Sequence, residues 1–268
     1  MVRKPAVAGY FYPGKAEELR ALVKGMVDPK AKKKKALAVV SPHAGLIYSG
    51  PVAGAVYSSV EIPDVVLILG PSHRGIRALF GIMPEGTWQT PLGEVPVNEA
   101  LARAILDRFP LVKEDAGGHA AEHSLEVQLP FLQFLKQDFS IVPVCVSPAA
   151  EYADLEGLAG ALADAVRQAG REVLLVSSTD MSHYVSQETA RKLDFLAIER
   201  MLALDARGLY DVVQEENISM CGFQPTTAVI LAAIKLGAAK AELIRYQTSG
   251  DVTGDYREVV GYAGIRIT

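Results

Sequence analysis

Short runs of Val, Ile and Leu recur along this chain, and this feature limits most strongly what the chain can fold into. Runs of this length, bounded by turn residues, are typical of strands that are buried on both faces of a sheet. We predict strands at Ala36–Val40, Val65–Leu69, Ile141–Val146, Val173–Val176, Leu243–Gln247 and Val259–Ile267.

Helix-like segments alternate with these strands. We predict helices at Ala16–Met26, Val52–Val60, Glu99–Arg108, Ser124–Leu135, Leu155–Gln168, Thr189–Leu204 and Thr226–Leu236. Pro130 lies inside the fourth of these segments, where we expect it to kink the helix or end it early. Strands that alternate with helices predict an α/β fold with a central mixed, largely parallel sheet that helices flank on both faces.

The chain is expected to form a single α/β domain over residues 1–268. A chain of this length could form one large domain or two small ones. However, it contains no repeat and no low-complexity linker long enough to separate two domains. Half of its residues are hydrophobic, which is enough for a sizeable core and excludes disorder as the main state.

Charge and composition argue against several classes of protein. The formal net charge is −4, and the only basic cluster, Lys30 with Lys32–Lys35, is expected to be a solvated loop. Two cysteines cannot form a disulfide framework. The first residues do not resemble a signal peptide, and the longest apolar segment, Thr227–Ile234, is far shorter than the roughly 20 residues of a membrane span. We therefore expect a soluble, cytoplasmic protein that binds neither nucleic acid nor membranes.

All five histidines occur in segments rich in Gly, Pro or Ser, which predicts turns. Three of them follow a predicted strand directly: His43 in SPHAG (41–45), His73 in LGPSHRG (69–75) and His183 in SSTDMSHY (177–184). Because the carboxyl ends of parallel strands share one edge of a sheet, these three side chains are expected to converge. A lone histidine of this kind is more often a structural residue, but converging imidazoles make a common site for zinc, copper or iron.

Asp180 lies three residues before His183 on the turn after a predicted strand. A carboxylate at this position could orient His183 and fix its tautomer, or it could cap the helix that follows. His183 could itself act as a general acid or base, because the ordinary pKa of histidine, about 6.5, lies near working pH.

A second histidine pattern points to a different chemistry. The string HAAEH contains His119, Glu122 and His123 and matches H-x-x-E-H, the zinc signature of one class of peptidase. Gly117 and Gly118 come directly before it, which places His119 at or before the start of a helix, and the motif does not account for the strand-end histidines. A zinc-dependent hydrolase built on this string remains an alternative.

The two cysteines are expected to differ. Cys221 lies in a turn ahead of a helix, where a thiol has a lowered pKa and becomes a better ligand or nucleophile. Cys145 lies in a predicted strand and is expected to be an inert core thiol. The chain has no G-x-S-x-G elbow, P-loop or dinucleotide-binding fingerprint, which argues against serine hydrolases, P-loop NTPases and dinucleotide enzymes.

Several motifs resemble, in order along nearly the whole chain, those of the Memo family. They are AVAGYFYPG (6–14), SPHAGLIYSGPVA (41–53), LGPSH (69–73), EHSLEVQLPF (122–131), SSTDMSHY (177–184), CGFQPT (221–226) and GYAG (261–264). In prokaryotes this family is the B protein of the AmmeMemoRadiSam system, which implies an AMMECR-type protein and a radical-SAM enzyme as partners.

The resemblance also implies a fold like that of class III extradiol (LigB-type) dioxygenases, which hold iron with two histidines and a glutamate. By motif, His43 and His73 match the two histidine ligands, and Cys221 stands where the carboxylate would be. His183 matches a catalytic histidine of the pocket, with Asp180 and His123 nearby.

These matches imply a metal-dependent oxidoreductase that uses iron(II) or copper(I). A thiolate in place of glutamate is softer and favours copper(I) or zinc, although iron(II) also remains compatible. The substrate would be a small molecule bound in the cleft. The alternative is a non-catalytic metal-binding adaptor that uses the same cleft to bind a protein or peptide, because a fold does not establish an activity.

Overall fold

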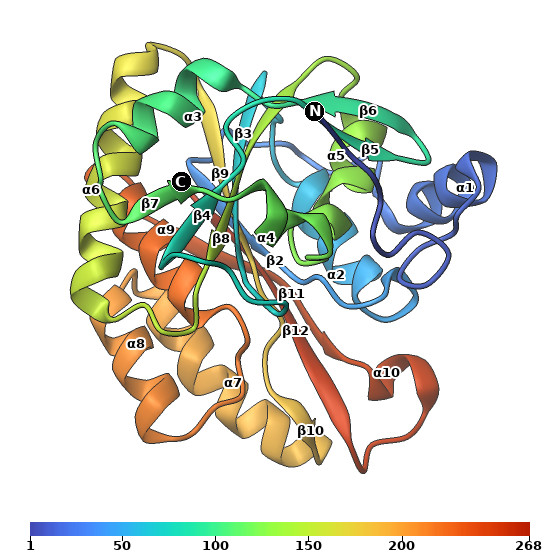
Figure 1. Cartoon of the computed structure of the whole chain (residues 1–268). Coiled ribbons are helices and arrows are strands. Elements are labelled where there is room, and N and C mark those ends of the chain that lie inside the picture. The colour runs from blue at the N-terminus through green and yellow to red at the C-terminus, as the bar shows by residue number, and fades with distance from the viewer.

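Four parallel strands form the centre of a nine-stranded sheet in the computed structural model, which describes residues 1–268 (Figure 1). In spatial order they are β2 (Ala38–Ser41), β9 (Val173–Ser178), β3 (Val65–Pro71) and β8 (Ser140–Val146). Every residue of these strands except Ser140 is buried, because helices cover both faces. Double-sided burial explains why these strands are continuous apolar runs rather than alternating patterns.

Strands of mixed direction flank this parallel centre. On one side β12 (Val259–Ile267) pairs antiparallel with β2, with β11 (Ala241–Thr248) and with β10 (His183–Val185). On the other side β4 (Phe80–Ile82) pairs antiparallel with β8 and parallel with β7 (Val112–Glu114). Three further strands, β1 (Val2–Arg3), β5 (Thr87–Thr90) and β6 (Gly93–Pro96), form a small separate sheet. The predicted α/β architecture with a central mixed sheet is confirmed.

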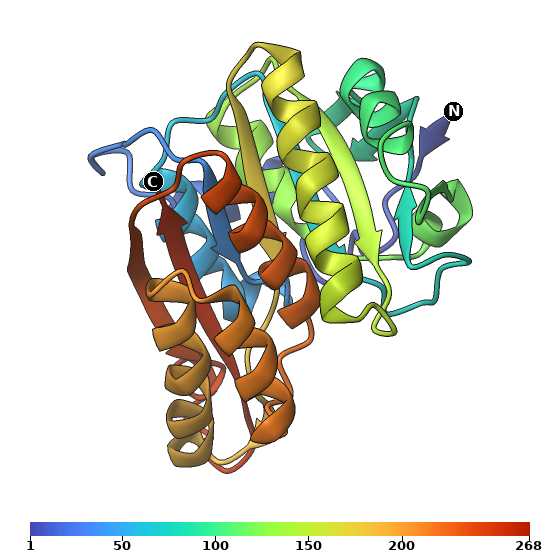
Figure 2. The same cartoon turned by 90° about the vertical axis from the view of Figure 1, so that its left-hand side faces the viewer.

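Two layers of helices enclose the sheet. One layer contains α1 (Ala16–Met26), α2 (Leu46–Ser58) and α5 (Leu129–Leu135). The other contains α3 (Glu99–Leu106), α6 (Tyr152–Ala169), α7 (Gln187–Leu202), α8 (Ala206–Glu215) and α9 (Phe223–Lys235); in Figure 2 the yellow α6 and the orange-red α9 cross the face that is turned to the viewer. Two short helices, α4 (Ala116–Ala120) and α10 (Gly250–Thr253), lie in loops. No helix has both the length and the apolar character that a membrane crossing requires.

Helix α2 begins six residues before the predicted Val52–Val60 segment. Backbone N–H groups of Tyr48 and Ser49 bond to the carbonyl of Gly45, and the Ser49 hydroxyl donates to the carbonyl of Ala44, 2.8 Å away. These bonds close the first turn, and Gly50 and Pro51, residue types that disfavour a helix interior, come directly after it. The earlier start brings the helix to within three residues of His43.

Pro130 neither kinks nor ends a helix. The chain instead makes a 3₁₀ turn at Glu126–Gln128, and α5 starts at Leu129, so that Pro130 occupies its first turn. The missing N–H of proline costs nothing at that position, because the first N–H groups of a helix have no partner within the helix. Two histidines also differ from the prediction that all five lie in turns: His119 lies in α4, and His183 is the first residue of β10.

Candidate metal centre

Adjacent parallel strands deliver His43 and His73 to one edge of the sheet. His43 comes two residues after the end of β2, and His73 comes two residues after the end of β3. Since β9 alone separates these strands, both loops leave the sheet at the same edge. The two imidazole rings lie with their centroids 5.3 Å apart, in a T-shaped arrangement. The expected convergence therefore holds for this pair.

A third histidine, His123, joins them from the loop between α4 and the 3₁₀ turn. Its ring stacks on that of His73 with centroids 4.5 Å apart and meets the ring of His43 edge-on at 5.4 Å. One ring nitrogen from each of the three histidines lies within 4.8 Å of the other two. The family resemblance implied that His123 lies in the pocket near His183, and the HAAEH alternative made it a zinc ligand together with His119.

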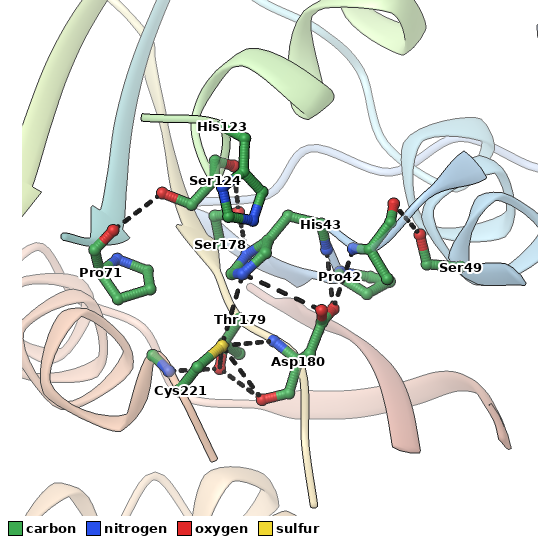
Figure 3. A network of polar contacts seen from close by, with 12 residues as sticks. Pro42, His43, Ser49, Pro71, His123, Ser124, Ser178, Thr179, Asp180 and Cys221 are labelled. Atoms are coloured by element: carbon green, nitrogen blue, oxygen red, sulfur yellow. Dashed lines mark hydrogen bonds and ion pairs between the residues drawn. The ribbon is translucent and has the colours of Figure 1, made fainter. Parts of the chain in front are cut away.

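Cys221 lies beside His43 at the edge of the sheet, next to the group of three histidines (Figure 3). Its sulfur lies 3.4 Å from Nε2 of His43 and accepts a hydrogen bond from the backbone N–H of Asp180 at 3.2 Å. Burial, with the Asp180 carboxylate adding to it, raises the pKa of the Cys221 thiol. This reverses the expected lowering, because desolvation outweighs the nearby helix start. The Cys221 thiol lies within hydrogen-bonding distance of Nε2 of His43 and of the carbonyl of Asp180.

Hydrogen bonds fix the tautomer of His43. The Ser178 hydroxyl donates its single proton to the carbonyl of Ser124, 2.6 Å away (Figure 3). It must therefore accept from Nε2 of Gln128 at 2.8 Å and from Nδ1 of His43 at 2.9 Å. His43 thus carries its proton on Nδ1 and presents the lone pair of Nε2 to the cluster, which is the arrangement that a metal ligand needs.

Glu122 fixes the tautomer of His73 in the same way. Its fully buried carboxylate lies 3.0 Å from Nδ1 of His73 and also accepts the backbone N–H groups of His73, His123 and Ser124. Burial acts to raise the pKa of Glu122, but the hydrogen bonds from His73 and Ser124 outweigh it and hold the pKa well below its usual range. The ionised carboxylate keeps the proton of His73 on Nδ1 and leaves Nε2 free, a second-layer arrangement common around metals.

The charge state of the cluster suits a metal. Burial, together with the neighbouring histidines, lowers the pKa of His43 to about 3 and that of His123 to about 4, so both are neutral at pH 7. Neutral imidazole nitrogens and one thiol form a donor set that fits zinc, copper or iron. His73 is the most accessible of the three, with 31% of its side chain exposed, which opens the cluster to solvent on that side.

Asp180 and His183 take different roles from the pairing expected between them. The carboxylate of Asp180 accepts the backbone N–H groups of His43 at 2.8 Å and Ala44 at 3.3 Å, so it holds the His43 loop. It does not cap the next helix, since the side chain of Ser186 caps α7. His183 is oriented instead by the carbonyl of Ser219, which lies 2.8 Å from Nδ1 and accepts the proton on that nitrogen.

His119 lies outside the cluster. This fully buried side chain donates from Nε2 to the carbonyl of Gly81, 3.1 Å away, and its Nδ1 accepts from the Cys145 thiol at 3.3 Å. Both ring nitrogens are therefore engaged within the core, and the Glu122 carboxylate is fully used by N–H donors. The HAAEH string does not assemble the two-histidine zinc site of a hydrolase.

The buried neutral histidines make the metal-free protein sensitive to acid. Burial lowers the pKa of His119 to about 4, against about 6.5 in an unfolded chain. The unfolded state therefore binds more protons as pH falls below 6.5, and stability falls with it. We expect His119 alone to account for about 2 kcal/mol of the loss between pH 7 and pH 5. In chemical denaturation of metal-free protein, His119→Gln should lose that much less over this interval; an unchanged pH dependence would contradict the burial of a neutral His119.

A solved structure has a related fold. An uncharacterized protein from Escherichia coli K12 aligns with a TM-score of 0.53 at 15% identity, and the alignment covers 85% of this chain and 99% of that chain. At this level of identity the likeness concerns the fold alone.

The family comparisons cover the chain almost completely. The model of the family described as Memo-like protein matches residues 3–266. A MEMO1 family protein of Methanopyrus kandleri is 41% identical over 99% of this chain and 98% of its own length. One of Thermotoga neapolitana is 42% identical over 98% of both chains. With the motifs of the site in place and matches of this extent, the chain belongs to the Memo family.

Proposed function

We propose that this protein is a metal-dependent oxidoreductase whose centre lies at the carboxyl edge of the sheet. His43, His73 and Cys221 are the proposed ligands, and iron(II) or copper(I) is the proposed ion. The observation that carries the proposal is that ring nitrogens of His43, His73 and His123 lie within 4.8 Å of one another, with the Cys221 sulfur 3.4 Å from Nε2 of His43. Buried partners fix the tautomers of His43 and His73. His123 lies close enough to both histidines to supply a further nitrogen donor.

A bound iron or copper ion would supply one-electron chemistry and a position at which a small molecule could bind, on the side where His73 is exposed. The protein's own residues have separate tasks. Glu122 and Ser178 hold the ligand rings, and Asp180 holds the loop that carries His43. His183 has its proton on Nδ1, so its Nε2 is free to accept a proton from a bound substrate.

A variant of His183 tests whether this residue acts in turnover and not in metal binding. We expect His183→Gln to retain metal and to lose metal-dependent turnover by about 10²–10⁴-fold, the usual contribution of a general acid or base. The measurement is metal content of protein purified anaerobically, followed by oxygen or peroxide consumption with a panel of small aromatic substrates. Unchanged turnover in His183→Gln would remove this residue from the mechanism.

The same measurement tests the proposed activity. A wild-type protein that holds metal but gives no turnover with oxygen or peroxide favours the adaptor function, in which the cleft binds a protein or peptide. If zinc is the native ion, the proposed metal ligands are supported, but the proposed redox activity is contradicted. The proposed AMMECR-type and radical-SAM partners are tested by whether they co-purify with the protein from its own host.

A further inference from the structure

The N-terminal segment contributes a buried charge to the region of the metal centre. Arg3 in β1 is only 5% exposed, and its guanidinium lies over the ring of Trp88 at 4.3 Å. It donates to the carbonyl of His119 at 3.0 Å and to the carbonyl of Glu122 at 2.5 Å, and it forms an ion pair with Glu126. All three acceptors of Arg3 thus belong to residues 119–126, the segment that carries Glu122 and His123.

Glu126 gathers the rest of the N-terminal segment around this arginine. Its carboxylate is fully buried and accepts the backbone N–H groups of Ala6 at 2.8 Å and Val7 at 3.2 Å, as well as the hydroxyl of Tyr12. Two charges are therefore removed from water together. The Glu126 carboxylate accepts four hydrogen bonds, and each nitrogen of the Arg3 guanidinium donates one. An apolar pair of similar volume could give comparable stability, so stability alone does not explain such a pair.

Phe11 links the same segment to two loops of the metal centre. Its ring packs on the ring of His123 with centroids 4.7 Å apart. Its carbonyl accepts the backbone N–H of Leu46 at 2.7 Å, at the start of α2 and three residues after His43. Residues 3–12 therefore contact both the loop that carries His43 and the loop that carries His123.

We propose that the Arg3–Glu126 pair is a positioning element of the metal centre. It holds residues 119–126 in the one arrangement in which Glu122 reaches Nδ1 of His73 and the ring of His123 faces those of His43 and His73. The proposal rests on the metal centre proposed above. It makes metal affinity depend on a residue of the N-terminal strand that touches none of the ligands.

Arg3→Lys is the variant of choice, because lysine keeps a charge opposite Glu126 but lacks the fork that bonds both carbonyls. Arg266→Lys is the matched control. Arg266 is also buried, at 6% exposure, and it also pairs with a carboxylate, Glu242 at 2.7 Å, and bonds a carbonyl, that of Ser59 at 2.9 Å. The partners of Arg266 do not belong to residues 119–126. Arg266→Lys therefore reports the effect of a weakened buried ion pair on stability, without a change at the metal centre.

The experiment measures zinc affinity by competition with a chelator and the visible absorption spectrum of the cobalt(II) form. We expect Arg3→Lys to bind zinc about tenfold or more weakly, as is usual when a group that orients metal ligands is lost, and to shift the cobalt bands. Arg266→Lys should show wild-type values for both. If Arg3→Lys does not fold, Tyr12→Phe takes its place, because it removes one hydrogen bond to Glu126 and keeps the ion pair. Tyr12→Phe should then also weaken zinc binding and shift the cobalt bands.

Wild-type affinity and an unshifted cobalt spectrum in Arg3→Lys would overturn the positioning role and leave the metal centre standing. Equal losses in Arg3→Lys and Arg266→Lys would overturn it too, because they would reflect general destabilisation. A wild-type protein that binds neither zinc nor cobalt in a His43-dependent manner would overturn the metal centre itself.

Discussion

We expect His43→Ala and His73→Ala each to abolish stoichiometric metal binding while the fold is retained. Both residues lie in loops at the sheet edge, and Nε2 of each has its lone pair free because Ser178 and Glu122 hold the proton on Nδ1. Loss of a group that only orients a ligand costs about 10–100-fold in metal affinity, so loss of a ligand should cost more than 100-fold. Metal content after dialysis, with circular dichroism as the check on folding, measures the effect.

His119→Gln is the control for these variants, because His119 is the one histidine of HAAEH whose ring nitrogens are both engaged in the core. It should keep full metal content. His123→Asn distinguishes a ligand from a pocket residue: a loss as large as that of His43→Ala makes His123 a ligand. Full metal content in both His43→Ala and His73→Ala would refute the assigned site.

The sequence predicts the parallel centre of the fold well because of how that centre is buried. Strands β2, β3, β8 and β9 are covered on both faces, so their apolar runs are continuous and each is visible without knowledge of its neighbours. The short strands β4 to β7 have three or four residues each, too few for a pattern. β4 pairs with β7 and β8, which lie far from it in sequence, whereas β5 and β6 form a local hairpin. Helix α8 is amphipathic but was not predicted.

Sheet topology predicts only the part of the site that strand ends carry. His43 and His73 follow strands, so the topology of parallel sheets places them together. His123 and Glu122 lie in a loop after α4, and their position depends on the bonds of Arg3 and Glu126, more than a hundred residues apart in sequence. The pKa of Cys221 was expected to be lowered by the helix start, whereas burial beside Asp180 raises it, and burial cannot be read from a local motif.

We expect Cys221→Glu to change which metal the proposed centre prefers. The Cys221 sulfur lies 3.4 Å from Nε2 of His43, close enough for both atoms to bind one ion. A thiolate is a soft donor that favours copper(I), whereas two histidines and one carboxylate form the ligand set suited to iron(II) and oxygen. We expect the wild-type protein to select copper(I) over iron(II), and Cys221→Glu to shift the ratio of the two affinities toward iron by about tenfold or more.

Cys221→Ser is the matched control for this substitution, because it removes the thiolate without adding a charge; it should weaken the binding of both ions and leave their ratio nearer to that of wild type. Anaerobic competition titrations on the three proteins measure the ratio. A thiolate ligand is also open to oxidation, so peroxide should modify Cys221 before the buried Cys145, and mass spectrometry reports which cysteine is modified.

The same ratio of copper(I) to iron(II) affinity in wild type and Cys221→Glu would place the sulfur outside the coordination sphere. His123 would then be the third ligand, since one of its ring nitrogens lies within 4.8 Å of ring nitrogens of both His43 and His73.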